Sequence, residues 1–145
     1  MMITRKVIVA GLAAGILFHI LQGAAAYFIF DQFYLENPDI IRDSNPFVGY
    51  YYLGVNVIVG LVISVLSGYL KNVFPDSDWK TGVKAALFIW VGSSLVFILK
   101  RQIILNLSNW LLLEIVSDFF IYCLVGAVAG YLSGRGIVEK VKEPI

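Results

Sequence analysis

The sequence predicts an all-α membrane protein whose four transmembrane helices form two tandem helical hairpins, related by a parallel internal repeat, in a single domain over residues 1–145. Three observations predict this fold. Four apolar runs are each long enough to cross a bilayer as a helix, small residues recur along one face of every run, and the two halves of the chain share a pattern of residues.

The composition is that of a membrane protein rather than of a soluble domain. Of the 145 residues, 59% are hydrophobic and 14% are charged, whereas globular proteins are about half apolar and about a quarter charged. The formal net charge is +1, so the chain has no large excess of positive charge that would indicate binding to nucleic acid. We expect the partners to be lipid and either other membrane subunits or a second copy of the chain. The single cysteine, Cys123, lies in an apolar run and is expected to be a packing residue.

Each apolar run is close to the length of about 20 residues that a transmembrane helix needs. The first run follows Arg5 and Lys6 and contains three alanines at 24–26, which also fits a cleavable secretory signal. Because the apolar residues continue past the alanines, we expect a retained span. Between the first two spans, two Asn-Pro pairs predict a loop from Asp31 to Gly49. The four predicted spans run from Val7 to Phe30, from Tyr50 to Leu70, from Gly82 to Leu99 and from Trp110 to Leu132.

The lysines and arginines predict the orientation, because the cytoplasmic flanks of membrane spans are rich in these residues. Three of the 11 cations, Arg42, Lys100 and Arg101, flank one side of the predicted spans. We therefore expect a multi-pass protein of the cell membrane with both termini in the cytoplasm. The remaining cations flank the other side and are Arg5, Lys6, Lys71, Lys80, Lys84, Arg135, Lys140 and Lys142.

The two halves of the chain, about 1–75 and 76–135, read as the same helical hairpin written twice. The tripeptide Gly-Tyr-Leu ends the second and the fourth span. Each half has an even number of spans, so the two hairpins share one orientation, unlike the inverted repeats of many transporters. Aligning the two hairpins pairs Ser64 with Gly126, Asn56 with Asp118, and Gly11 with Gly82.

Small residues at four-residue spacing let helix backbones approach closely in lipid, where apolar side chains alone provide no driving force. Every span has such a face, which predicts a compact helix bundle. The helix-packing residues on these faces are Gly11, Gly15 and Gly23 in the first span, Gly60, Ser64 and Gly68 in the second, Gly82, Ala86 and Ser93 in the third, and Gly126, Gly130 and Gly134 in the fourth.

Polar side chains at membrane depth are the candidates for a functional site, because burying them in lipid is costly. Counting about 1.5 Å per residue along the spans places several of them in one polar layer. One interpretation is a proton or ion site in which Asp118 accepts a hydrogen bond from His19, and Asn56 completes the set of polar groups around the bound proton or ion. The other, which we favour, is hydrogen bonding between helices, worth about 1 kcal/mol or less. The residues of this candidate site are His19, Gln22, Asn56, Ser94 and Asp118.

No cofactor, metal site or catalytic residue is expected. A single histidine cannot supply both axial ligands of a bis-histidine haem, so haem would require a dimer. Ser94 has no base in the sequence apart from His19. Glu114 follows Lys100 and Arg101 and is explained by pairing at the membrane boundary.

The run from Val9 to Gly15, together with the Gly-Tyr-Leu endings, resembles small four-helix membrane proteins from prokaryotes. This resemblance implies the four-helix layout and no functional residues. The leading functional hypothesis is a non-catalytic membrane protein that acts through helix packing, as an accessory or structural subunit of a membrane complex or as a homo-oligomer. The alternative is a small transporter or channel that uses the polar layer around His19, Asn56 and Asp118.

Overall fold

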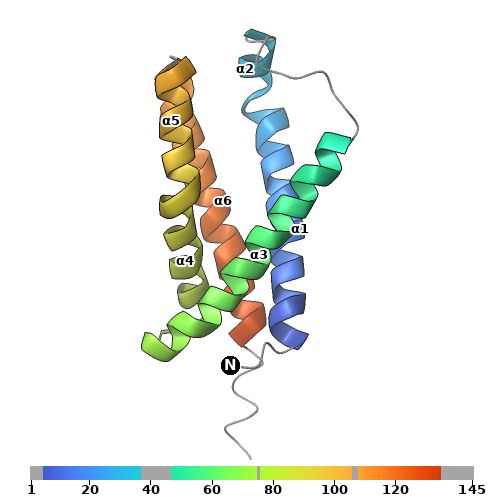
Figure 1. Cartoon of the computed structure of the whole chain (residues 1–145), viewed down its shortest axis with the longest axis vertical. Helices are drawn as coiled ribbons and strands as arrows, with labels where there is room; N and C mark the ends of the chain where they lie inside the picture. The colour runs from blue at the N-terminus through green and yellow to red at the C-terminus, as the bar shows by residue number, and fades with distance from the viewer. Residues whose placement is uncertain (1–4, 37–46, 75, 106–107, 135–145) are drawn as a thin grey trace, which may run out of the picture.

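The computed structural model describes residues 5–36, 47–74, 76–105 and 108–134, and every regular element in them is helical (Figure 1). In Figure 1 the beginning of α1 and the end of α6 lie at the lower end of the bundle, and α2 lies at the upper end. The elements are α1 (Arg5–Phe28), α2 (Asp31–Glu36), α3 (Phe47–Val73), α4 (Asp78–Ile89), the π-helix η2 (Trp90–Leu95), α5 (Val96–Leu105) and α6 (Ser108–Gly134).

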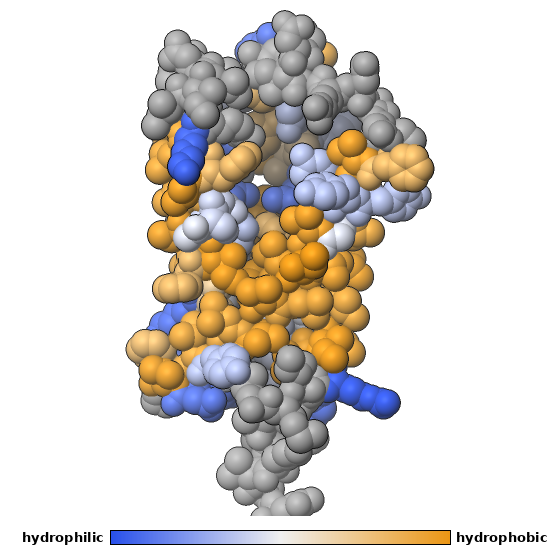
Figure 2. Space-filling model, in the orientation of Figure 1, coloured by the Kyte–Doolittle hydropathy of each residue, from blue (hydrophilic) through white to orange (hydrophobic). Residues whose placement is uncertain are grey.

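Four helices in the described part of the chain are long and apolar enough to cross a membrane, which confirms the predicted number of apolar helices. They indicate a multi-pass membrane protein. In the view of Figure 2 the hydrophobic surface forms a band across the middle of the molecule, with hydrophilic side chains below it. The candidate spans are Arg5–Phe28, Phe47–Val73, Asp78–Lys100 and Trp110–Gly134.

The third long helix is interrupted by a π-helix, whereas the sequence predicts a continuous α-helix there. Its middle turns, Trp90–Leu95, are a π-helix that joins α4 to α5. Ser93 donates a hydrogen bond from its hydroxyl to the Ile89 carbonyl oxygen at 2.6 Å. A serine bonded to the preceding turn commonly distorts a helix, and single π turns change the direction of the residues that follow.

The predicted loop between the first two spans contains a short helix. α2 occupies the beginning of this segment, where the Gln32 amide donates a hydrogen bond to Glu36 at 2.9 Å. Phe33 is the buried residue of α2 and holds it against the bundle. The two Asn-Pro pairs of the predicted loop lie outside the described residues.

The first hairpin, α1 with α3, is held by backbone contact at glycine. A Cβ built at Gly60 of α3 would lie 2.7 Å from the Gly15 Cα of α1 and closer still to the Gly11 carbonyl oxygen. Only hydrogen fits there, so the two backbones touch, which is how helices associate in lipid. One turn below, Ser64 is fully buried and donates a hydrogen bond to the Val7 carbonyl oxygen at 2.9 Å.

The second hairpin, α4 with α6, is held in the same way. A Cβ built at Gly82 would lie 2.7 Å from the Gly130 Cα, and one built at Gly126 would lie 2.6 Å from the Ala86 Cβ. Gly126 therefore lies on α4 between two small residues one turn apart, as Gly60 does on α1. These contacts match Gly126 with Gly60, whereas the sequence alignment pairs it with Ser64, one turn along. The tandem repeat itself stays a prediction.

The helices are close together in the lower half of the bundle and separate in the upper half (Figure 1). Gly68 and Gly134, at the lower ends of α3 and α6, are buried. In the upper half α5 packs mainly against α6, and α3 leans away from α5. Within the described part of the chain, a Cβ built at Gly23, Gly49, Gly54 or Gly92 would meet no atom of a neighbouring element within 4 Å.

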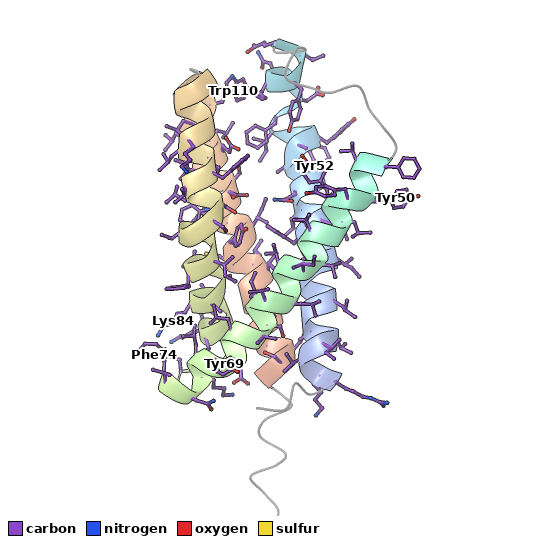
Figure 3. The ribbon with its side chains drawn as sticks, in the orientation of Figure 1. Tyr50, Tyr52, Tyr69, Phe74, Lys84 and Trp110 are labelled. Atoms are coloured by element: carbon purple, nitrogen blue, oxygen red, sulfur yellow. The ribbon has the colours of Figure 1, made fainter. Side chains whose placement is uncertain are left out.

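Two ion pairs lie at the lower end of the bundle, where α3 connects to α4. Lys71 pairs with Asp78, and Lys84 pairs with Asp76 and lies 4.8 Å above the Phe74 ring (Figure 3). The hydrogen bond and charge of Lys84 lower the pKa of Asp76 below its usual value. Because both side chains of the Asp76 pair are partly exposed, this pair orients the connection rather than stabilising the bundle strongly.

Candidate functional site

A cavity of about 530 Å³ lies between the separated upper halves of the helices. Residues of α1, α2, α3 and α6 line it, with Phe97 of α5 at one side. Figure 2 shows a hollow in the upper part of the molecule, with hydrophilic side chains inside it. The ionisable, amide and hydroxyl side chains of the lining, apart from two tyrosines, are His19, Gln22, Asn56, Glu114, Ser117 and Asp118.

Asn56 joins α3 to α1 at the lower part of the cavity. Its side-chain amide donates a hydrogen bond to Gln22 Oε1 at 2.9 Å and lies 3.5 Å from His19 Nδ1. The amide group carries two hydrogens, so it can serve both neighbours. Asn56 is only 4% exposed, and the close approach at Gly15, where a Cβ would lie 2.8 Å from the Asn56 carbonyl oxygen, fixes its position. The backbone contact below therefore places this polar cluster.

Asp118 lines the same cavity from α6, together with Glu114 and Ser117. Glu114 and Asp118 are four residues apart and so lie on one face of the helix. Ser117, between them, donates a hydrogen bond to the Glu114 carbonyl oxygen at 3.1 Å. Our sequence interpretation paired Glu114 with the cations before it and did not include it in the site. The four-residue spacing to Asp118 is the signal that would have found it.

Ser94, the fifth predicted site residue, does not line the cavity. Its hydroxyl lies 2.6 Å from the Tyr122 hydroxyl, in the packed part of the bundle. Tyr122 is 3% exposed and packs edge-on against Phe18, with ring centroids 4.8 Å apart. The cavity therefore brings together four of the five predicted residues, and Ser94 belongs to a separate contact between η2 and α6.

Aromatic rings surround the upper part of the cavity. The Phe33 ring of α2 packs edge-on against Trp110 of α6, with centroids 5.5 Å apart, and Phe30 lies 6.5 Å from the same indole. In Figure 3, Trp110 lies between the beginning of α6 and α2. These contacts fix α2 over the cavity. The aromatic residues of the lining are Phe30, Phe33, Tyr34, Tyr52, Phe97 and Trp110.

The lining of the cavity combines polar side chains with aromatic rings. Within the described residues, no group of three or more His, Cys, Asp or Glu side chains is placed to hold a metal ion. Carboxylate, imidazole and amide groups in an aromatic surround are typical of a ligand-binding cavity, whose usual volume is about 300–1,000 Å³. The volume of about 530 Å³ lies in this range.

No protein-family model matches the chain, and neither a curated protein nor a solved structure matches it. The fold and the cavity are thus the observations from which a function is inferred. Both come from the described residues of the chain itself.

Proposed function

We propose that this chain is a small membrane transporter or channel that takes a polar solute into the cavity at the upper end of its bundle. One observation carries the proposal: α1, α3 and α6 place His19, Asn56 and Asp118, which are far apart in sequence, around one open volume. Asn56 bonds to Gln22 and approaches His19 between α1 and α3, but hydrogen bonds that only hold helices together need no cavity beside them. The cavity of about 530 Å³ beside them is within the usual size of a ligand-binding site.

The burial of these groups supports the same proposal. Placing an ionisable side chain such as Asp118 in a membrane-spanning helix is costly, and such residues usually face a water-filled or ligand-filled space. In the lower half of the bundle, by contrast, the helix pairs are in close backbone contact at Gly60 and Gly82. Close packing thus already holds both hairpins together, and the polar groups lie where the packing is open.

A second candidate is the accessory subunit or homo-oligomer that acts by helix packing. An assembly of this kind needs small residues on the surface of the bundle, where a helix of another subunit can pack against them. Gly23, Gly54 and Gly92, which are exposed and have nothing within 4 Å of a built Cβ, provide such positions. The native mass after gentle extraction tests this candidate, and a lone monomer under all conditions would contradict it.

We propose that the protein lies in the plasma membrane with both termini in the cytoplasm. In this orientation the cavity is on the outer side of the membrane. In a variant with Cys123 replaced by serine, new cysteines at Ser44 and Ser77 should then react with a membrane-impermeant thiol reagent from opposite sides. Ser44 should be labelled in intact cells, and Ser77 only after the membrane is opened. Labelling of both in intact cells would contradict the four-span topology.

Flux into proteoliposomes tests the transport proposal. Liposomes with the full chain should show flux of at least one solute in a panel of protons, potassium ions and a labelled organic cation. Asp118→Asn keeps the size of the side chain but removes its charge from the cavity, so it should reduce that flux at least about tenfold. Asp31→Asn is the control, because Asp31 is exposed on α2 and does not line the cavity. Equal flux in the two variants would contradict the role of the cavity.

A further inference from the structure

Three side chains at the lower part of the cavity form one polar cluster, which consists of His19, Gln22 and Asn56. Asn56 Nδ2 lies 2.9 Å from Gln22 Oε1 and 3.5 Å from His19 Nδ1. Both neighbours accept from the same amide nitrogen, whose two hydrogens are used in this way. A neutral imidazole that accepts a hydrogen bond at Nδ1 carries its proton on Nε2. His19 therefore presents an N–H donor at Nε2.

The polar cluster keeps three hydrogen-bonding groups unused. His19 Nε2 and the Gln22 side-chain nitrogen are donors, and Asn56 Oδ1 is an acceptor. Among the described residues these three atoms have no hydrogen-bond partner, although their side chains line the cavity. In the same part of the chain, the buried side-chain atom that is sealed off without a partner is Trp90 Nε1. The three atoms of the cluster are thus reachable from the cavity.

Burial makes the unused acceptor of Asn56 significant. The residue is only 4% exposed, and buried polar groups in proteins are almost always bonded to protein, water or ligand. The close approach of α1 at Gly15 to the Asn56 carbonyl oxygen fixes the backbone, so the side chain cannot move far from the cavity. Water can bond to these groups, and a solute that displaces the water must offer the same hydrogen bonds.

Two donors and one acceptor in a single cluster match a carboxamide group. A carboxamide is planar and has a carbonyl acceptor beside its N–H donors. A ketone lacks the donors, and an ammonium group lacks the acceptor. Aromatic rings lie above the cluster, where Phe33 packs edge-on against Trp110 with centroids 5.5 Å apart. The lining therefore suits a carboxamide attached to a flat apolar body.

We propose that the cavity recognises its solute by a carboxamide group. The carbonyl oxygen of the solute accepts hydrogen bonds from His19 Nε2 and from the Gln22 amide, and its N–H group donates to Asn56 Oδ1. An aromatic or other apolar remainder lies against the rings of the upper cavity. This proposal rests on the proposed function and names the chemical class of the solute.

Equilibrium dialysis of the full chain in detergent tests the proposal with two pairs of labelled probes. The first pair is nicotinamide and 3-acetylpyridine, which are nearly equal in size, because the ketone has a methyl group in place of the amide nitrogen. The second pair is the N-methylated cations of these two molecules. Charge is the same within each pair, so the comparison reports the amide alone. We expect saturable binding of an amide at least about tenfold tighter than that of its ketone, since a site built for a hydrogen bond rejects the analogue that lacks it.

Three variants test the roles of the donors. His19→Phe and Gln22→Met remove one donor each and add no charge, so each should reduce the preference for the amide over the ketone. His19→Gln retains an N–H donor and should keep more of this preference than His19→Phe. Gln32→Met is the matched control, because Gln32 is exposed on α2 and does not line the cavity. Thermal unfolding shows whether each variant is folded, and the probe pairs also test the parent protein without any substitution.

Three results would overturn the proposal. The first is equal binding of amide and ketone in both pairs, and the second is a preference that neither folded donor variant changes. The third is an absence of binding by any probe to protein whose proteoliposomes still show Asp118-dependent flux. That third result would exclude the carboxamide and retain the proposed function, whereas loss of all Asp118-dependent flux would exclude the proposed function as well. The labelled N-methylated nicotinamide also serves as the organic cation of the flux assay.

Discussion

Gly60→Ala should destabilise the protein by about 1–3 kcal/mol or more, the usual cost of forcing extra atoms into a packed contact. A Cβ at Gly60 would lie 2.7 Å from the Gly15 Cα, and the Gly11 carbonyl oxygen would be closer still. These neighbours are backbone atoms, so no side chain can turn aside, and α1 and α3 must move apart. Thermal unfolding of the purified protein in detergent measures the effect, together with the fraction that elutes as folded protein in size exclusion.

Gly54→Ala is the matched control on the same helix. A Cβ at Gly54 meets nothing within 4 Å, and alanine is the better helix former by about 1 kcal/mol. This variant should therefore keep or slightly raise the unfolding temperature. If both variants behave alike, close contact at Gly60 does not hold the first hairpin together. Because Asn56 lies one turn above Gly60, Gly60→Ala should also disturb its bond to Gln22.

Hydropathy predicts the four long helices well because a span in lipid must satisfy its backbone hydrogen bonds within itself, and the α-helix does this. Each described helix therefore lies close to its predicted run, although the second begins at Phe47 rather than at Tyr50 and the third at Asp78 rather than at Gly82. The π-helix and α2 could not be predicted in this way. The π turn depends on local bonding such as that between Ser93 and Ile89, and α2 depends on the contact of Phe33 with Trp110, which is distant in sequence.

The sequence predicts how deep each polar side chain of the candidate site lies along its helix, but not the direction in which that side chain points around the helix. Counting residues along each span gives the height of a side chain, and His19, Asn56 and Asp118 do line one cavity. The direction of a side chain around the helix requires an unbroken period of 3.6 residues. The π-helix breaks this period just where Ser94 lies, so Ser94 meets Tyr122 instead of the cavity. Glu114 was assigned to the boundary because charge order along the chain does not reveal which face it occupies.

Ser117→Trp should abolish solute binding and flux while the protein stays folded. Ser117 lines the cavity between Glu114 and Asp118, so an indole at this position would fill much of the volume of about 530 Å³. It changes no charge, and it adds apolar contacts where the helices are separated. We expect at least about a tenfold loss of the Asp118-dependent flux, the scale on which a blocked site loses its ligand, with an unfolding temperature close to that of the parent protein.

Val116→Trp is the control, because the same side chain is added one residue earlier on α6. Val116 is 42% exposed and does not line the cavity, so its indole would face the surface of the bundle, where a bilayer accepts aromatic rings. Flux should then match that of the parent protein. Full activity of Ser117→Trp would show that solute does not pass through the cavity, and equal loss in both variants would mean that any added bulk on α6 is harmful. Only loss confined to Ser117→Trp assigns the function to the open volume between the helices.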